Sequence, residues 1–271
     1  MSGSARCGYR PEGVAPKGRA VVLLSGGLDS ATALAIAHAE GWDCLALTVR
    51  YGQRHELEVE RARRVAEALG AVEHRLIDLD LSAWGGSSLV GDGEIPIDGA
   101  NVAGGAVAAE GGRVAPEPGT PAATGAPEAG GAAGIPSTYV PARNTVLLSL
   151  ALAWAEASGA GAIFLGVSAV DFSGYPDCRP GFIAAFQEVA RVATRAGLEG
   201  RAPVIRAPLL HKSKAETIRW GLALEVDYGL TWSCYNPRPD GRPCRSCDSC
   251  RLRARGFAEA EVEDPLLAPG A

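Results

Sequence analysis

The sequence predicts an α/β protein built on a doubly wound, parallel five-stranded sheet, with a zinc-binding segment near its C-terminus. Two patterns favour the sheet: short apolar runs alternate with segments of helical periodicity, and these runs are apolar throughout, as in strands buried on both faces. A third pattern, four cysteines between residues 234 and 250, favours the metal. The length of 271 residues allows one such domain with an appendage.

The first half of the chain predicts a parallel βαβ start. An apolar run at residues 20–24 ends at a glycine pair, helix formers follow at 30–39, and a second apolar run spans 44–49. The next segment, 56–69, is charged but places Leu57, Val65 and Leu69 close to helical spacing, which predicts a surface helix packed on the sheet. Residues 74–79 are the third predicted strand.

The second half predicts two more strands, at 162–167 and 204–209, and helices at 145–157, 180–196 and 213–222. Ser213 precedes the last of these helices and Glu216 lies three residues on, the pattern of a capping box. We therefore expect an N-terminal arm at 1–18, an α/β domain at 19–230, a metal-binding segment at 231–265 and a tail at 266–271.

An insertion of low complexity interrupts the α/β domain at about residues 90–134. Between 99 and 134, 26 of 36 residues are Gly, Ala or Pro and four are charged. Such a composition offers little apolar surface to offset the entropy of ordering the chain. We expect a flexible loop.

Composition and charge exclude some classes of function. The chain is 47% hydrophobic and 21% charged, with a net charge of −5. No apolar run reaches the roughly 18 residues of a membrane span, and the N-terminus lacks the hydrophobic core of a signal peptide. The acidic balance disfavours a bulk nucleic-acid binder. We expect a cytoplasmic protein with neither a membrane nor a nucleic acid as direct partner.

A glycine-containing loop stands where the first strand meets the first helix, and it reads Ser-Gly-Gly-Leu-Asp-Ser over residues 25–30. Glycines let the backbone approach an anion, and the amide groups at a helix N-terminus favour negative charge. No lysine follows as in a Walker loop, and the three-glycine dinucleotide pattern is absent. The hexapeptide resembles the pyrophosphate loop of the ATP pyrophosphatase superfamily; the alternative is a plain strand-to-helix turn without a ligand.

The four clustered cysteines predict one structural zinc ion per chain. Their spacing gives two overlapping CxxC pairs and a more distant fourth thiolate, a set that closes a tetrahedral shell and leaves no position for water. An iron–sulfur cluster and redox-active thiols are the alternatives. A fifth cysteine, Cys178, precedes Arg179 and is either a small buried residue or a reactive thiolate. The predicted zinc ligands are Cys234, Cys244, Cys247 and Cys250.

Five blocks of the sequence, in the same order, resemble the 7-cyano-7-deazaguanine synthase family, which belongs to the ATP pyrophosphatase superfamily. They are 24–34 around the loop, 51–55 (Tyr-Gly-Gln-Arg-His), 139–144 (Tyr-Val-Pro-Ala-Arg-Asn), 171–180 (Asp-Phe-Ser-Gly-Tyr-Pro-Asp-Cys-Arg-Pro) and 231–235 with the three later cysteines. The resemblance covers about residues 20 to 265 apart from the insertion. It implies an adenine nucleotide alpha hydrolase-like fold, a homodimer, and a place in queuosine biosynthesis.

The resemblance also implies a ligase reaction. ATP would activate the carboxylate of 7-carboxy-7-deazaguanine as an adenylate, ammonia would form the amide, and a second ATP would activate the amide oxygen to give the nitrile. ATP would occupy the loop and the start of the helix, with Mg²⁺ at Asp29 because a hard cation prefers carboxylate oxygen. The nucleotide-binding residues would be Leu24, Ser25, Gly26, Gly27, Leu28, Asp29, Ser30, Ala31, Thr32, Ala33 and Leu34.

Chemistry suggests further site residues. Besides Asp29 and Ser30 we expect Arg143 and Arg179 to act in catalysis, since guanidinium groups suit phosphate or carboxylate. The candidates for substrate contacts are Asp171 and Asp177, which could accept hydrogen bonds from a guanine-like edge, and Lys214 or Lys212, which could neutralise phosphate. The alternatives are surface ion pairs for the arginines and turn residues for the aspartates. His55 is either a proton shuttle or a residue with an N-cap or core role.

Two other functions compete with this interpretation. A relative on the same ATP-cleaving scaffold could act on a different acceptor, such as a protein. The second competing function is that of a zinc-ribbon RNA-binding module. Arginines at 245, 251, 253 and 255, which lie beside the cysteines, suggest it.

Overall fold

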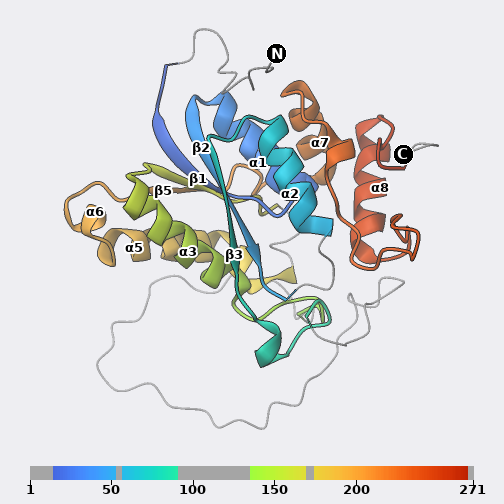
Figure 1. The fold of residues 1–271 in the computed structure, drawn as a ribbon, viewed down its shortest axis with the longest axis horizontal. Helices are drawn as coiled ribbons and strands as arrows, with labels where there is room; N and C mark the ends of the chain where they lie inside the picture. The colour runs from blue at the N-terminus through green and yellow to red at the C-terminus, as the bar shows by residue number, and fades with distance from the viewer. Residues whose placement is uncertain (1–14, 53–56, 91–134, 169–173, 268–271) are drawn as a thin grey trace, which may run out of the picture.

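The computed structural model describes residues 15–52, 57–90, 135–168 and 174–267, which form one twisted sheet with helices on both faces (Figure 1). The order of the strands is β3-β2-β1-β4-β5, and every neighbouring pair is parallel. The predicted five-stranded, doubly wound sheet is therefore confirmed. Its strands are β1 (Gly18–Leu23), β2 (Trp42–Arg50), β3 (Glu73–Asp78), β4 (Ala162–Phe164) and β5 (Val204–Arg206).

Each predicted helix of the α/β domain is present, with bounds within a few residues of the prediction except for the segment 180–196. Ser213 and Glu216 form the predicted capping box at the start of α7. The helices are α1 (Leu28–Ala39), α2 (Leu57–Ala68), α3 (Arg143–Ser158), α5 (Pro180–Val192), α6 (Arg195–Leu198), α7 (Lys214–Ala223) and α8 (Asp248–Ala260), and 3-10 turns lie at η1 (Ser82–Trp84), η3 (Pro176–Cys178) and η4 (Tyr228–Leu230).

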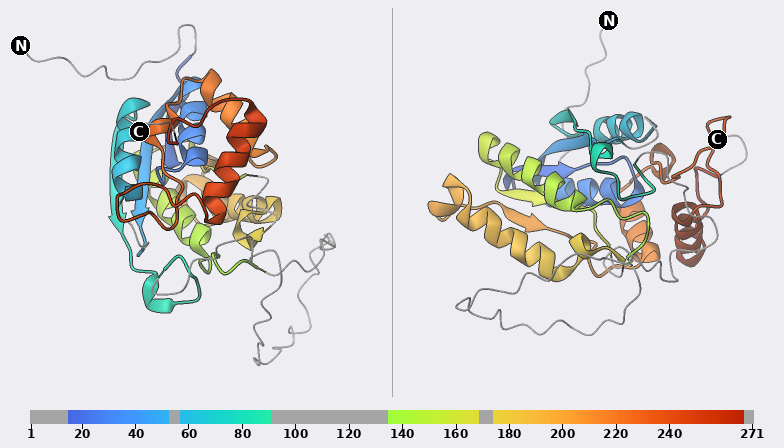
Figure 2. Two further views of the ribbon diagram at one scale, coloured as in Figure 1. Left: turned by 90° about the vertical axis from the view of Figure 1, so that its right-hand side faces the viewer. Right: turned by 90° about the horizontal axis from the view of Figure 1, so that it is seen from below.

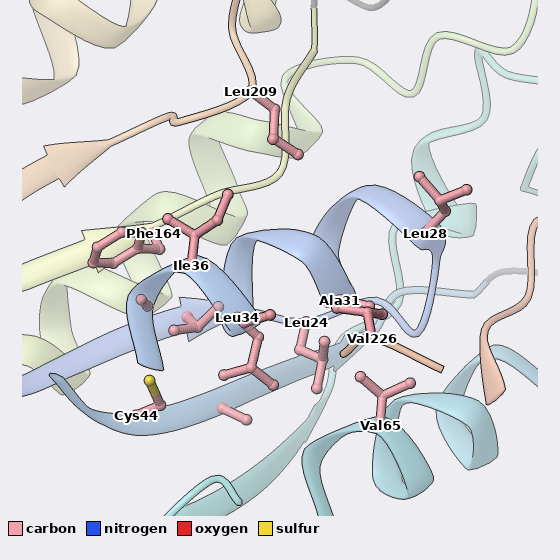
Figure 3. Packing of buried hydrophobic residues seen from close by; sticks show 14 of the residues in the cluster. Leu24, Leu28, Ala31, Leu34, Ile36, Cys44, Val65, Phe164, Leu209 and Val226 are labelled. Carbon is pink, nitrogen blue, oxygen red and sulfur yellow. The ribbon is translucent and has the colours of Figure 1, made fainter. Parts of the chain in front are cut away.

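Two apolar cores explain why the run at 20–24, which includes most of β1, is apolar. Side chains alternate along a strand, so Val22 packs with α1, α2 and α7 on one face, while Val21 packs with α3 and α5 on the other; both are fully buried. Figure 3 shows the first core around Leu34, Val65 and Phe164. The helices therefore fix the sheet from both sides, and only its edges and strand ends remain for a ligand.

The prediction of one helix over 180–196 is wrong at its end. Helix α5 stops at Val192, and Thr194 caps the short helix α6 by accepting a hydrogen bond from the Gly197 amide at 2.9 Å. The Thr194 hydroxyl also donates to the Ala190 carbonyl at 2.8 Å. A threonine hydroxyl that bonds to nearby backbone competes with helix continuation, which explains the break.

Helix α8, which follows the cysteine cluster, is a further element that the apolar pattern did not predict. Figure 2 shows α8 lying against α7 at the outside of the molecule, where Phe257 joins the first core. Its many arginines hide the apolar spacing. No helix among the described residues is long and apolar enough to span a membrane. Residues 1–14, most of the predicted insertion (91–134), His55 and Asp171 lie outside the described residues.

Candidate functional site

A cleft of about 260 Å³ opens at the carboxyl ends of β1, β2 and β4. Strand β1 is the point where the winding reverses, since β2 and β3 follow on one side and β4 and β5 on the other. Doubly wound sheets bind ligands at this switch point. The cleft joins the predicted loop to segments far along the chain, including Glu58, Arg143, Cys178 and Trp232.

The loop at 25–30 is held in shape by its own serines. The Ser30 hydroxyl lies 3.2 Å from the Ser25 amide and 3.0 Å from the Gly27 carbonyl, donating to the latter. The Ser25 hydroxyl in turn accepts from the Gly27 amide at 3.3 Å. These bonds preorganise the turn that leads into α1, whose N-terminus faces the cleft. The geometry suits an anionic ligand.

Gly26 lets three elements meet at the loop. Its φ is +84°, and a Cβ at this position would lie 2.5 Å from the Glu58 carbonyl oxygen and 2.7 Å from the Ala62 nitrogen, both on α2. On its other side the Trp232 amide donates to the Gly26 carbonyl at 2.9 Å. Only glycine fits this position, because a side chain would collide with backbone that cannot move away.

Asp29 and Lys214, predicted separately, form one ion pair. The Lys214 ammonium lies 2.8 and 2.6 Å from the two carboxylate oxygens of Asp29, and both side chains are largely shielded from solvent. The pair places a cation beside the loop. A magnesium ion at Asp29 would have to displace Lys214, so that role stays a prediction, as does the phosphate contact of Lys214. Lys212 pairs instead with Glu216 at 3.3 Å.

The two predicted arginines differ in position. Arg143 begins α3 and lines the cleft, where its guanidinium donates to the Tyr51 hydroxyl at 3.3 Å and lies over the Tyr51 ring. Burial also raises the pKa of Tyr51, which keeps this phenol neutral. Arg179 is exposed just before α5 and does not line the cleft in the described part of the chain. A catalytic role for Arg179 stays a prediction.

Asp177 has a structural use that the sequence did not reveal. Its buried carboxylate accepts a hydrogen bond from the Asn144 amide at 2.8 Å and so caps the first turn of α3. The Asn144 side chain donates to the Asp177 carbonyl at 3.0 Å and to the Cys178 sulfur at 3.1 Å. These contacts fix Arg143, the neighbour of Asn144. Direct contact of Asp177 with a substrate stays a prediction, and Cys178 is buried at the cleft wall.

Glu58 is a cleft residue that sequence reasoning missed. It lies in the first turn of α2, and its side chain lines the cleft. Burial raises the pKa of this carboxyl, partly opposed by Arg143, to about 7. Nothing in the charged sequence 56–69 separates Glu58 from its exposed neighbours, except that it follows the Tyr-Gly-Gln-Arg-His block by a few residues.

The four cysteines converge as a metal site requires. The sulfur atoms of Cys234, Cys244, Cys247 and Cys250 all lie within 4.8 Å of one another. A tetrahedral zinc ion with bonds of about 2.3 Å holds its sulfurs about 3.8 Å apart, so the set fits. A four-iron cluster, in which each thiolate binds a different iron, would spread the sulfurs more widely.

Hydrogen bonds prepare these sulfurs for a cation. The Cys244 amide donates to the Cys234 sulfur at 3.2 Å, and the Cys247 amide donates to the Cys244 sulfur at 3.3 Å. The neighbouring thiols Cys234 and Cys250 lower the pKa of Cys247, which favours the thiolate that binds metal.

A buried ion pair fastens the metal segment to the domain. Arg253 on α8 donates to both oxygens of Asp264, at 2.7 and 2.8 Å, and both side chains are almost fully buried. Its other donors reach the Tyr228 carbonyl at 2.9 Å and the Thr231 hydroxyl at 2.8 Å. The segment therefore forms a wall of the cleft, with Cys234 and Trp232 in the lining, and is not a separate module.

Comparison with known proteins decides the family. The model of the family described as queuosine biosynthesis protein QueC matches residues 19–261. This chain belongs to the QueC family. The match spans the loop at 25–30, Arg143 and all four cysteines, so the family resemblance inferred from the sequence is confirmed.

Relatives in the QueC family cover nearly the whole chain. The 7-cyano-7-deazaguanine synthase of Frankia casuarinae is 54% identical over 254 residues, which are 93% of this chain and 95% of the relative. The synthase of Syntrophus aciditrophicus is 53% identical over 94% of this chain and 99% of the relative. Among solved structures, NMN synthetase from Francisella tularensis covers 93% of this chain and 90% of its own, with 14% identity and a TM-score of 0.42, a likeness too distant to support an argument.

Proposed function

We propose that this QueC-family protein is an ATP-dependent carbon–nitrogen ligase that converts 7-carboxy-7-deazaguanine and ammonia into 7-cyano-7-deazaguanine. One observation carries the proposal: the cleft brings the phosphate loop and Arg143 together, in a chain more than half identical to a synthase of that name. The loop can hold the diphosphate of ATP, and Arg143 can hold an acid.

The first half of the reaction forms an amide. The substrate carboxylate attacks the α-phosphorus of ATP, the bond to the β-phosphate oxygen breaks, and pyrophosphate leaves from the loop. Ammonia then forms a C–N bond at the adenylated carbon, and AMP leaves with the former carboxylate oxygen. A free carboxylate is a poor electrophile, so this activation is what makes the C–N bond accessible.

The second half removes the remaining oxygen. The amide oxygen attacks a second ATP and pyrophosphate leaves again. Loss of both N–H protons from nitrogen and of AMP from carbon then gives the nitrile. Because the same loop can hold the second nucleotide, one site serves both halves.

Product analysis tests the proposal. Purified protein is incubated with ATP, 7-carboxy-7-deazaguanine and ammonium, and products are followed by mass spectrometry. We expect amide and then nitrile, with AMP and pyrophosphate formed twice per nitrile. Matched reactions omit ammonium or replace the acid by 7-deazaguanine, which has no carboxyl group, and should yield neither product. Absence of amide and nitrile from the complete mixture would refute the assignment.

The metals also belong to this proposal. The four-cysteine group suits one zinc ion per chain, which when bound supplies stability rather than chemistry because no ligand position stays open. Mg²⁺ would screen the phosphates of ATP. Metal analysis of the purified protein checks the stoichiometry.

A homodimer and a cytoplasmic location complete the proposal. The resemblance to the family suggests the dimer, and light scattering of the purified protein tests it. No cysteine within the described residues forms a disulfide, as expected in a reducing compartment. Fractionation of cells tests the location.

A further inference from the structure

The proposed reaction must remove protons from nitrogen. At neutral pH almost all ammonia is ammonium, which has no lone pair and cannot attack a carbonyl carbon. One proton has to leave before the C–N bond forms, a second leaves as the amide forms, and the amide loses both of its N–H protons when it is converted to the nitrile. A group in the cleft that accepts protons near neutral pH would serve both steps.

Two carboxylates line the cleft in the described part of the chain, Asp29 and Glu58. Both oxygens of Asp29 are held by Lys214 at the loop, a position suited to phosphate rather than to the nucleophile. No histidine lines the cleft among the described residues. Glu58 is therefore the carboxylate left for acid–base chemistry at nitrogen.

The surroundings of Glu58 suit a proton acceptor. Its main-chain carbonyl touches the space beside Gly26, so the residue lies directly next to the loop. Among the described residues, no side chain donates a hydrogen bond to the Glu58 carboxylate or forms an ion pair with it. The charge of Arg143 on α3 acts on this carboxylate from a greater distance. Tyr51, Trp232 and Tyr235 supply aromatic walls to the same cleft, and such rings attract a cation such as ammonium.

We propose that Glu58 is a catalytic residue, which binds ammonium in the cleft and accepts its proton. This inference rests on the proposed function and adds the acid–base group to it. Ammonium transfers a proton to the carboxylate, giving ammonia and the neutral acid. The nitrogen lone pair then forms the C–N bond, the C–O bond to AMP breaks, and the excess proton leaves to water. Glu58 gives its proton to water between the two halves. In the second half the regenerated carboxylate takes one N–H proton, and water takes the other, as AMP departs.

The pKa of Glu58 supports this assignment. A carboxyl with an ordinary pKa is fully ionised at neutral pH but is too weak a base for ammonium, whereas burial brings the pKa of Glu58 to about 7. The groups that face it are Arg143 from α3, which favours the ionised form, and Tyr51 after β2, which stays neutral. Above about pH 7 the carboxylate dominates and can accept the proton.

A substitution separates this role from binding. Glu58→Gln should lower the rate of ammonia-dependent amide formation about 100- to 1000-fold. It should leave ATP–pyrophosphate exchange, measured with 7-carboxy-7-deazaguanine and no ammonia, within about threefold of the wild type, because adenylation needs no base at nitrogen. Hydroxylamine, which is largely uncharged at neutral pH, should restore much of the acyl transfer.

The pH profile gives a second readout. At fixed total ammonia the wild-type rate should rise up to about pH 7 and then level off, as the carboxylate forms. In Glu58→Gln the rate should keep rising with the fraction of free ammonia. Glu60→Gln is the matched control, since Glu60 lies on the same helix, is paired with Arg64 at 3.0 Å and does not line the cleft; it should behave as the wild type.

Two results would overturn the inference. In the first, Glu58→Gln forms the amide at the wild-type rate and with the wild-type pH profile; in the second, the variant loses pyrophosphate exchange as well as amide formation. The first shows that the carboxylate is dispensable, and the second that it serves binding or folding. If the wild-type protein makes neither amide nor nitrile, both the proposed function and this inference are wrong. If the wild type makes both products and Glu58→Gln makes them at the same rate, only this inference is wrong.

Discussion

At the scale of single residues, the missing side chain of Gly26 allows the loop, α2 and the Trp232 segment to meet. A Cβ there would face backbone atoms at 2.5 and 2.7 Å. At Gly200 the φ is +74°, also positive, but nothing lies within 4 Å of a Cβ. A side chain at Gly200 would cost backbone strain alone, whereas a side chain at Gly26 would cost backbone strain and a collision with α2.

Gly26→Ala should therefore destabilise the protein by about 3 kcal/mol or more, while Gly200→Ala should cost about 1 kcal/mol. Urea unfolding measures both free energies. The Gly26 variant should also bind ATP more weakly, which calorimetry detects. Equal losses of stability in the two variants would show that the close approach of α2 is unimportant.

Arg143 is the cation most closely built into the cleft, since Asp177 and Asn144 fix the first turn of its helix. Arg143→Met should lower kcat/KM for the acid about 100-fold, because a charged hydrogen-bonding group is lost from a shielded site. Steady-state kinetics checks this. Arg191→Met, on the exposed side of α5 where Arg191 pairs with Glu188, is the control and should have wild-type kinetics. If Arg143→Met had the wild-type kcat/KM for the acid, Arg143 would have no role in binding the acid.

At the scale of elements, helix α8 depends on the cysteine cluster and on Arg253. Cys247 is the residue that precedes α8, and Cys250 lies in its first turn, so two of the four sulfurs fix where the helix begins. Arg253, one turn later, bonds to Asp264 and to the backbone at Tyr228. A metal would thus hold α8 against α7 and the cleft.

Cys247→Ser should abolish stoichiometric zinc binding and lower the melting temperature, because metal binding energy is part of the folding energy of such a segment. Metal analysis and calorimetry measure the two effects. Cys178→Ser, a like substitution away from the cluster, should retain one zinc. A Cys247 variant with unchanged zinc content and melting temperature would exclude the structural metal.

Elements with a strong apolar pattern or a recognisable capping box could be predicted from the sequence, and those without either could not. The run at 20–24 identifies β1 because both its faces are buried, and Ser213 identifies the start of α7 through its cap. The break at Thr194 and helix α8 escaped prediction. Thr194 bonds to local backbone at Ala190 and Gly197, which an apolar pattern does not reveal, and the apolar face of α8 is shared with the buried Arg253.

At the scale of the whole molecule, the predicted insertion begins and ends at one place on the surface. The Ser88 amide donates to the Ser137 carbonyl at 2.9 Å, and Val90 packs with Val140, so the described ends on either side lie close together. The fold does not need the intervening 91–134 to join them.

Replacing residues 91–134 by a short Gly/Ser linker should therefore leave the melting temperature within a few degrees and kcat/KM within about threefold, since loop length changes stability only slowly. Calorimetry and steady-state kinetics check this. Retained stability with a large loss of activity would instead assign the insertion a role at the cleft.

The candidate site was predictable where its parts are local in sequence. The loop and the cysteines are contiguous patterns, and the QueC-family match spans both. The Asp29–Lys214 pair joins residues 185 positions apart, and Asp177 caps α3 from 33 positions away, so their uses depend on the tertiary fold. Glu58 escaped notice because burial, which alters its acidity, is a property of the assembled cleft.

The Trp232 amide, bonded to Gly26, bears on how the protein is made. The loop at 25–30 and the wall of the cleft around Trp232 come from distant parts of the sequence. During synthesis the loop can therefore reach its final surroundings only after the Trp232 segment has also been made.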